Sequence, residues 1–298
     1  MAKVSAYIRE WKMTVVSQHS GKTIAAKDDL RVIQCADCGI KHLDPIPASA
    51  SADYSSGFYH CSVKPSMGED YERDQKWWKE THLDWLSLVP ARPGGRLLDV
   101  GSGTASFLKT ARLAGWDVVG LEPDYEMSKR DPAVLWLEYQ DYLGTRYDVV
   151  SAHWVLEHLS DASHFMRWAK ARLDDLGYLL ITLPNDFSEI QTRAMEAVNQ
   201  PYYWLDKYHI NYWNKMDFLQ FAKCHGFETV ATYGSWQPEK YLVDGMNYLE
   251  DQTLGRQFHR YRIENDLSES QRYRRGKYRL WGELGWGRDL TYILRKML

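Results

Sequence analysis

The amino-acid sequence predicts an α/β fold in which a parallel β-sheet is covered by helices on both faces. Three observations lead to this prediction. An apolar run before Asp99 turns through glycines directly into a helical pattern, as a buried strand followed by a helix would. Further strand-like runs alternate with helical patterns, which is typical of parallel βαβ units. The chain has 298 residues, of which 44% are apolar, and this is enough for one large core with additions.

Strands of this sheet are expected near residues 96–101, 117–122, 134–138, 147–152 and 177–183. Helical patterns fill most of the gaps between them, for example Ser160 to Leu173. In such a sheet, ligands bind across the carboxyl ends of the strands. Polar residues that directly follow a strand are therefore the first candidates for a binding site.

The turn after the first of these strands reads R-L-L-D-V-G-S-G-T-A at residues 96–105. Its glycines let the backbone approach a ligand closely, and the start of the following helix offers unpaired N–H groups. A phosphate-binding loop would carry a Lys-Ser/Thr pair after its glycines, and that pair is absent here. The carboxylate of Asp99 instead suits a ligand that carries an ammonium group.

The second strand ends in an acid, Glu122, which lies 21 residues beyond Gly101. This is about the distance at which a βαβ unit places an acid on the hydroxyls of a ribose. The stretches L-L-D-V-G-S-G-T-A, G-W-D-V-V-G-L-E-P-D and Y-D-V-V-S-A-H-W-V-L-E-H-L resemble the class I S-adenosylmethionine-dependent methyltransferases. They occur in the order and at the spacing of that family, with Ala105 where the family usually has a third glycine. A dinucleotide-binding oxidoreductase is the alternative, since it shares the βαβ layout.

The resemblance implies a Rossmann-like, seven-stranded class I methyltransferase sheet whose last strand, near 290–295, runs antiparallel. It also implies three parts of the chain. Residues 1–60 would form a small ribbon-like segment, 61–238 the S-adenosylmethionine-binding core, and 239–298 a helical insertion over the acceptor together with the last strand.

S-adenosylmethionine is the cofactor that the resemblance implies, with S-adenosylhomocysteine as its product. Gln140 and Asp141 follow the third strand, where the family contacts adenine, and His153 and Trp154 end the fourth strand, beside the expected sulfonium. Glu157, and His158 next to it, could be catalytic, but in this position they more often support the cofactor loop. The expected cofactor-binding residues are Asp99, Gly101, Ser102, Gly103, Glu122, Pro123, Gln140, Asp141, His153 and Trp154.

Cys35-Ala-Asp-Cys38-Gly is half of a structural zinc site. The region resembles methyltransferases of sugar and polysaccharide pathways, which carry two C-x-x-C pairs at their N-terminus. The first pair is replaced here by Ser17-Gln-His19-Ser20, so two thiolates are missing. Substitute ligands would have to come from His19, His42, His60 or Cys61. Zinc is thus possible, but we favour a degenerate ribbon that is held by packing and has no metal ligands.

An aromatic-rich stretch at 202–213 follows the fifth strand and contains the candidate general base, His209. It is similar to the H-x-x-Y-F-S stretch of sugar C-methyltransferases, in which the histidine is a proposed base. The match covers His209 and Tyr212, with Trp213 in place of phenylalanine, while Asp206 stands where that family has a tyrosine. His209, Tyr212 and Asp206 are therefore the candidate catalytic residues. A structural, hydrogen-bonding role is the alternative for the histidine.

The resemblance favours methyl transfer to a small polar acceptor such as a sugar, a nucleotide-sugar or a glycan-related molecule. The alternatives are an O- or N-methyltransferase of another secondary metabolite and a non-catalytic S-adenosylmethionine-binding partner protein. Basic residues in the C-terminal insertion could clamp a phosphorylated acceptor, or they could form a solvated helix face. These residues are Arg272, Arg274, Arg275, Lys277 and Arg279.

Composition excludes several other classes of protein. The formal net charge of −3 gives no general attraction to nucleic acid or to an anionic membrane, and nucleic-acid-binding modules are not recognisable. No run of 18 apolar residues exists, so no membrane span is expected. The polar N-terminus is unlike a signal peptide, and four cysteines do not make a disulfide framework in a chain of this length. A cytoplasmic location is therefore expected.

Overall fold

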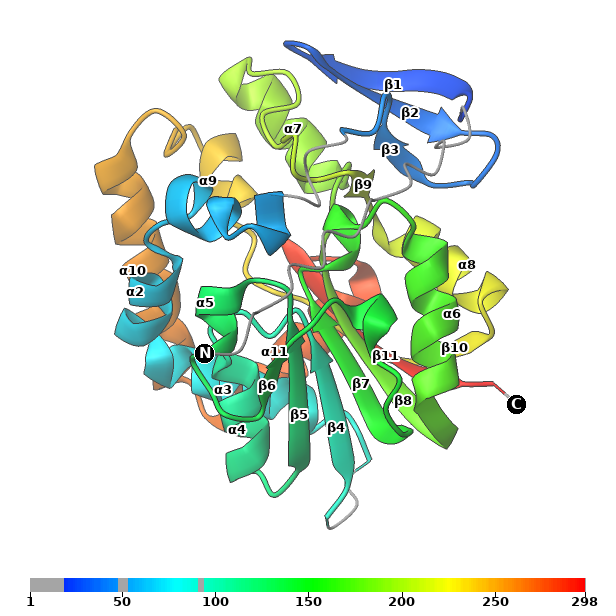
Figure 1. The fold of residues 1–298 in the computed structure, drawn as a ribbon. Helices are drawn as coiled ribbons and strands as arrows, with labels where there is room; N and C mark the ends of the chain where they lie inside the picture. Colours follow the sequence, from blue (N-terminus) through cyan, green and yellow to red (C-terminus); the bar gives the residue numbers. More distant parts are fainter. Residues whose placement is uncertain (1–18, 48–52, 91–93, 298) are drawn as a thin grey trace, which may run out of the picture.

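The computed structural model describes residues 19–47, 53–90 and 94–297, and it contains a seven-stranded mixed sheet (Figure 1). Its strands are β4 (Arg96–Val100), β5 (Asp117–Glu122), β6 (Val134–Trp136), β7 (Tyr147–His153), β8 (Leu173–Pro184), β10 (Phe227–Tyr233) and β11 (Asp289–Lys296). Their order across the sheet is β10-β11-β8-β7-β4-β5-β6. β11 runs antiparallel to both of its neighbours, while β4 to β8 are parallel. The predicted α/β class, the strand number and the antiparallel last strand are confirmed.

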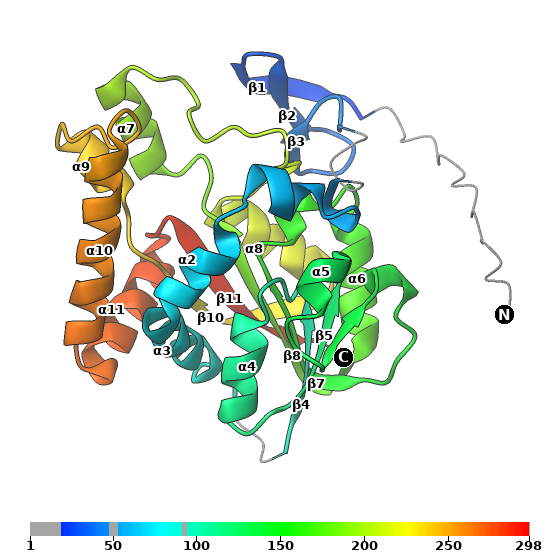
Figure 2. The same cartoon turned by 60° about the vertical axis from the view of Figure 1, so that its left-hand side comes forward.

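Helices cover both faces of this sheet because each central strand is apolar on both sides. Side chains alternate along a strand, so Leu98 joins Phe165 of α6 (Ala162–Arg172) in one core cluster. Leu97 joins Leu108 of α4 (Ser106–Leu113) in the cluster on the opposite face. The first cluster also includes α8 (Lys215–Cys224), and the second includes α3 (Gln75–Leu86), so the two layers lie on opposite sides of the sheet (Figure 2).

Short elements lie around the edge where the parallel strands end. They are the π-helical turn η1 (Tyr59–Val63), α2 (Met67–Arg73), α5 (Tyr125–Ser128) and the 3-10 turns η2 (Tyr139–Asp141) and η3 (Leu156–His158). The glycine turn, η2 and η3 each follow a parallel strand directly or within a few residues. This edge therefore collects the loops that the sequence predicted to bind ligands.

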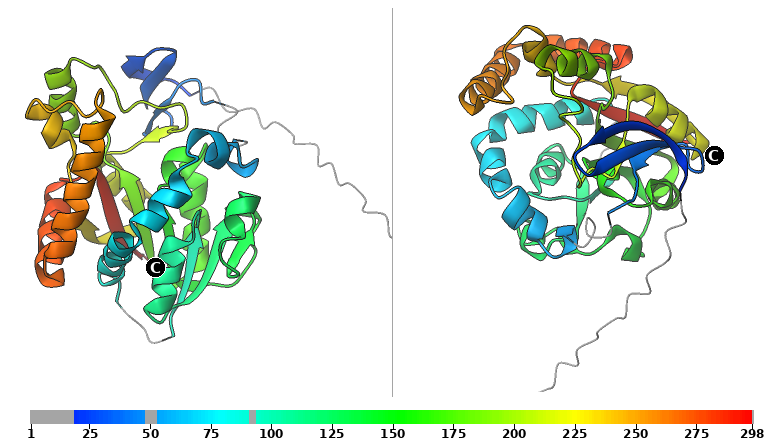
Figure 3. Two further views of the ribbon diagram at one scale, coloured as in Figure 1. Left: turned by 90° about the vertical axis from the view of Figure 1, so that its left-hand side faces the viewer. Right: turned by 90° about the horizontal axis from the view of Figure 1, so that it is seen from above.

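A second, four-stranded antiparallel sheet lies above that edge (Figure 3). The ribbon strands β1 (Gly21–Lys27), β2 (Leu30–Cys35) and β3 (Lys41–Leu43) are joined by β9 (Asn211–Tyr212), in the order β1-β2-β3-β9. β9 belongs to the aromatic-rich stretch that contains His209, so the ribbon is tied to the segment that carries the candidate base. Ser17, one of the residues replacing a cysteine of the first pair, lies outside the described residues.

The C-terminal insertion is helical, as predicted. It contains α9 (Glu239–Val243), α10 (Gln252–Ser268) and α11 (Gln271–Leu284), and α7 (Glu189–Val198) lies beside α9 (Figure 1). The indole of Trp77 on α3 donates to the carboxylate of Asp266 on α10 at 2.9 Å. None of the helices in the described part of the chain is both long and apolar enough to cross a membrane.

A buried ion network holds α11 against α3. The carboxylate of Asp84 is fully buried and accepts from Arg274 Nε at 2.6 Å and from Arg275 Nε at 2.8 Å. Tyr233 of β10 donates its hydroxyl hydrogen to the same carboxylate at 3.0 Å. The network thus joins two helices and a sheet strand that are far apart in the sequence.

We predict that Asp84→Ala lowers the free energy of unfolding by about 3–5 kcal/mol, because it leaves the guanidinium of Arg274 buried beside a single remaining acid. Urea unfolding followed by circular dichroism measures this loss. Glu283→Ala is the matched control, since it removes an exposed pair with Arg279 and should cost no more than about 1 kcal/mol. Equal losses in the two variants would contradict the role given to the buried network.

Candidate functional site

An open cleft of about 240 Å³ lies at the carboxyl edge of β4, β5 and β7. Its walls come from the glycine turn, the end of β5, the segment before η2, the end of β7 and aromatic side chains of the segment before α2. The expected cofactor residues that line it are Asp99, Gly101, Ser102, Gly103, Glu122, Pro123, His153 and Trp154. The structure thus brings eight of the ten expected residues together.

The glycine turn is held against β5 by backbone hydrogen bonds. The N–H groups of Gly101 and Ser102 both donate to the carbonyl of Leu121, at 2.8 and 3.1 Å. Gly101 has a φ of +69°, and a Cβ placed on it would lie 2.7 Å from a methyl carbon of Val155. Ala105, at the position of the family's third glycine, is buried with a φ of +59°. A left-handed conformation explains why glycine is usual at that position.

Two buried carboxylates face the cleft from neighbouring strands. Glu122 accepts from the N–H of Gly103 at 2.7 Å and from the N–H of Asp124 at 3.0 Å. Asp99 accepts from the hydroxyl of Ser151 at 2.7 Å. Burial raises the pKa of each carboxyl, Asp99 and Glu122 alike, to about 7. Burying a carboxylate costs free energy unless a cation or further hydrogen-bond donors surround it. This pair therefore favours a ligand that supplies both a cation and hydrogen-bond donors.

The other two expected cofactor residues are placed elsewhere. Gln140 and Asp141 lie in η2 with exposed side chains and are not among the residues that line the cleft. Leu137, Glu138 and Tyr139 line it instead. Leu137 and Glu138 directly follow β6, so the rule that ligands meet the first residues after a parallel strand would have selected them.

The side chains at the end of β7 are held by ring packing and hydrogen bonds. His153 packs flat on Trp85, with ring centroids 4.8 Å apart, and its Nδ1 lies 2.8 Å from the hydroxyl of Thr182. Burial holds the pKa of His153 well below its usual value, so the imidazole is neutral. Trp154 has a φ of +54°, which is rare for a bulky residue, and its indole donates to Asp289 at 3.0 Å.

His158 is a cleft residue that the candidate list left out. Its Nδ1 lies 2.7 Å from the carbonyl oxygen of Tyr208, so Nδ1 carries the hydrogen and Nε2 keeps a lone pair. The hydroxyl of Tyr54 lies 2.9 Å from the same Nδ1. Burial lowers the pKa of His158 to about 3. The signal was present in the sequence, since the residue belongs to the V-L-E-H-L stretch that follows the fourth predicted strand.

The three candidate catalytic residues lie together at one turn, where their hydrogen bonds run through the backbone of Asp206. His209 lies next to His158, with ring centroids 5.0 Å apart, but it is not among the residues that line the cleft. Burial lowers the pKa of His209 to about 4. Tyr212 is fully buried and donates its hydroxyl hydrogen to the backbone carbonyl of Asp206 at 3.1 Å. The exposed carboxylate of Asp206 accepts from the N–H of Tyr208 at 2.7 Å. Asp206 and Tyr212 therefore brace the turn that presents His209.

The basic cluster of α11 has partners within the fold. Arg274 and Arg275 bind the carboxylate of Asp84, and Lys277 binds Asp266 at 3.3 Å and Glu269 at 2.7 Å. Ion pairing inside the protein thus explains these three residues. They provide no free clamp for a phosphorylated acceptor.

Comparison with known proteins places the chain in a family. A family model described as a methyltransferase domain matches residues 72–232, which is more than half of the chain. A relative from Azorhizobium caulinodans, named ubiquinone biosynthesis O-methyltransferase, is 28% identical over 138 residues. The match covers 42% of this chain and 53% of that protein, so the chain spans about half the length of this curated relative.

Solved structures share the fold. One is a complex between the Haloferax volcanii Trm112 methyltransferase activator and a methyltransferase. The matched chain of that complex has a TM-score of 0.50 and 14% identity, and the match covers 78% of this chain and 96% of that chain. Another is an S-adenosylmethionine-dependent methyltransferase from Thermotoga maritima, with a TM-score of 0.50 and 15% identity. The match covers 82% of this chain and 100% of that chain. S-adenosylmethionine, the cofactor predicted from the motifs, is that of this class. The chain belongs to the methyltransferase-domain family and has the α/β fold of the class I S-adenosylmethionine-dependent methyltransferases.

Proposed function

We propose that the protein transfers a methyl group from S-adenosylmethionine to a hydroxyl of a small polar acceptor. The observation that carries this proposal is the pair of buried carboxylates, Asp99 and Glu122, beside the glycine turn. Within the described residues neither has a cationic partner, and both line the open cleft. An amino-acid group and a ribose on one ligand would supply the ammonium and the hydroxyl donors that these acids lack.

The cofactor roles follow from the placement of each side chain. Asp99 would accept from the ammonium group, and Glu122 would accept from the ribose hydroxyls with its remaining lone pairs. Leu137, Glu138 and Tyr139 would contact the adenine ring. Bound in this way, the cofactor supplies a methyl group already activated by its sulfonium, so the protein has to align the acceptor, exclude water and remove a proton.

The residue best placed to remove that proton is His158. It lines the cleft, and its Nδ1–H is held by the Tyr208 carbonyl, so the free lone pair is at Nε2. A carboxyl oxygen of Glu157 lies 4.0 Å from Nε2, and burial raises the pKa of that carboxyl. His209 lies next to His158 and remains the second candidate for the base.

The acceptor is proposed to be a sugar-like hydroxyl compound, in keeping with the resemblance to sugar-pathway methyltransferases. An aromatic hydroxyl is the second candidate. Tyr54, Tyr59 and Tyr71 line the cleft and could stack on either kind of ring. The relative from Azorhizobium caulinodans, whose name describes an O-methyltransferase, also fits the second candidate.

Incubating the protein with cell extract and methyl-labelled S-adenosylmethionine tests the activity itself. We expect mass spectrometry to find the label on the oxygen of a small polar molecule, with equimolar S-adenosylhomocysteine. Label on nitrogen or carbon would contradict the hydroxyl acceptor. Binding of S-adenosylhomocysteine with no transferred label in any fraction would favour a non-catalytic partner protein.

Replacing the ribose-binding acid tests the cofactor site. We predict that Glu122→Ala weakens S-adenosylhomocysteine binding by about 1–3 kcal/mol, because ribose hydrogen bonds are lost, and calorimetry measures this change. Glu126→Ala is the matched control, since its carboxylate is exposed in the neighbouring helix. Binding of NADH without binding of S-adenosylhomocysteine would contradict the assignment.

The buried acids also predict how binding depends on pH. Their pKa values of about 7 mean that they are largely protonated in the free protein below that pH. An ammonium group on Asp99 favours the ionised form, so ligand binding must release a proton there. We predict that S-adenosylhomocysteine affinity falls as the pH drops below about 7, and that Asp99→Asn flattens this dependence. Calorimetry across a pH series would contradict the prediction if the wild-type affinity stayed constant.

Conservative substitutions can distinguish the roles of His158 and His209. We predict that His158→Gln reduces turnover by roughly 10²–10⁴-fold with little change in S-adenosylhomocysteine affinity, the usual effect of removing a general base. His209→Gln should reduce turnover less, and His225→Gln, at the C-terminal cap of α8 and outside the set of residues that line the cleft, should leave it unchanged. Steady-state kinetics measure all three. A larger loss in His209→Gln than in His158→Gln would assign the base to His209.

A further inference from the structure

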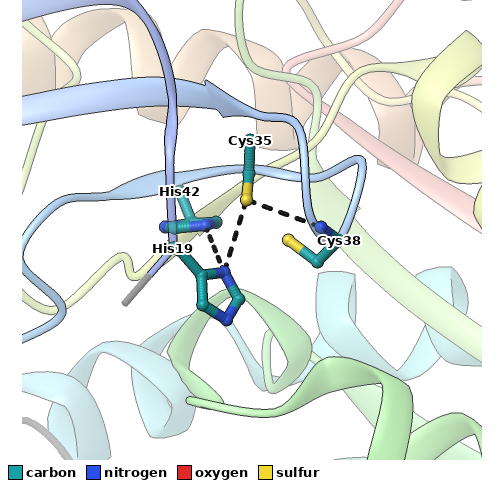
Figure 4. Close-up of side chains that lie close together, drawn as sticks. All are labelled: His19, Cys35, Cys38 and His42. Atoms are coloured by element: carbon teal, nitrogen blue, oxygen red, sulfur yellow. Dashed lines mark hydrogen bonds between the residues drawn. The ribbon is translucent and has the colours of Figure 1, made fainter. Parts of the chain in front are cut away.

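Four side chains of the ribbon converge on one point, as Figure 4 shows. They are His19 before β1, Cys35 at the end of β2, Cys38 in the following turn and His42 in β3. One nitrogen or sulfur atom from each lies within 4.8 Å of the corresponding atom of the other three. His19 Nδ1 is 3.0 Å from His42 Nε2 and 3.3 Å from Cys35 Sγ.

These distances fit a tetrahedral metal site. Zinc binds thiolates at about 2.3 Å and imidazole nitrogens at about 2.0–2.1 Å, so its ligand atoms lie roughly 3.3–3.8 Å apart in a tetrahedron. The observed separations bracket that range. Two sulfurs and two imidazole nitrogens are a usual donor set for structural zinc and an unsuitable one for magnesium or calcium, which prefer oxygen.

The turn between the two cysteines is arranged around a sulfur. The N–H groups of Asp37 and Cys38 donate to Cys35 Sγ at 3.4 and 3.5 Å. Gly39 has a φ of +76° and donates its N–H to the carbonyl of Cys35 at 3.2 Å, which turns the chain back into β3. Such donors stabilise negative charge on the sulfur, as a metal-bound thiolate requires.

The histidines are held in place by other bonds. His42 is buried and donates Nδ1–H to the carbonyl of Leu43 at 2.7 Å, which leaves the lone pair on Nε2, the atom that faces the cluster. Ser20, next to His19, donates its N–H to Asp37 at 2.7 Å and accepts from the N–H of Ala36 at 2.8 Å. The segment that carries His19, just before β1, is thus fastened to the cysteine turn.

We propose that His19, Cys35, Cys38 and His42 form a structural site for Zn²⁺. This replaces the expectation from the sequence of a ribbon without metal ligands, because the two histidines take the places of the missing thiolates. His60 and Cys61, the other substitutes considered, lie elsewhere: His60 Nδ1 is 2.7 Å from the carboxylate of Asp124, and Cys61 is exposed.

The site would stabilise more than the ribbon. His42 pairs with Asn211 across β3 and β9. The amide of Asn211 donates to the carbonyls of Leu156 and Leu159, at 2.9 and 2.7 Å, on either side of His158. His42, one of the proposed metal ligands, is therefore connected through its strand partner Asn211 to the loop that carries the proposed base, His158.

Elemental analysis of the full chain, purified without added zinc and then loaded with one equivalent, tests the site. We expect one zinc per chain, lost in Cys35→Ser and in His19→Ala. Cys224→Ser is the matched control, since that thiol is exposed on α8 and should keep the full equivalent. With Co²⁺ in place of zinc, we expect the absorption of a tetrahedral thiolate complex in the control and its loss in Cys35→Ser.

Folding is followed separately by S-adenosylhomocysteine binding, which should remain measurable in Cys35→Ser. If the cysteine variant fails to fold, chelation of the wild-type protein followed by thiol titration decides the question. We expect four titratable thiols in the chelated protein and fewer in the zinc form. No bound zinc after loading, zinc retained by Cys35→Ser, or a Cys35–Cys38 disulfide would each overturn the proposal.

Discussion

The parallel pairing of β4 with β5 is the constraint on which the cleft depends. It aligns Asp99 with Gly120 and Val100 with Leu121, so that the glycine turn and Glu122 emerge side by side. Leu121 then accepts from the N–H groups of the turn, and Glu122 accepts from Gly103. A shift of one residue in this register would send Asp99 to the other face of the sheet. The position of both buried acids is thus a consequence of strand pairing.

Much of this arrangement could be predicted because its determinants are local. The strands and the glycine turn are each defined by a few consecutive residues, and parallel strands carry their ends to a common edge. Loop geometry was harder to predict. Gln140 and Asp141 were expected to contact adenine, but a 3-10 turn exposes them and leaves Glu138 in the wall of the cleft.

Contacts between distant segments could not be read from local patterns. Arg274 meets Asp84 across 190 residues, so an arginine from the stretch that suggested a phosphate clamp is ion-paired inside the fold. His209 was selected because of its neighbours in sequence, yet it does not line the cleft, whereas its neighbour in space, His158, does. His19 and His42 are 23 residues apart and approach each other only because β1, β2 and β3 form a sheet.

The central claim is that the two acids hold the two polar ends of S-adenosylmethionine. A crystal structure of the protein with S-adenosylhomocysteine tests it most directly. The account predicts the amino group of the ligand within hydrogen-bond distance of Asp99 and the ribose hydroxyls on Glu122, with the sulfur near the end of β7. A ligand bound elsewhere, or one whose amino group and ribose leave both acids without a partner, would contradict it.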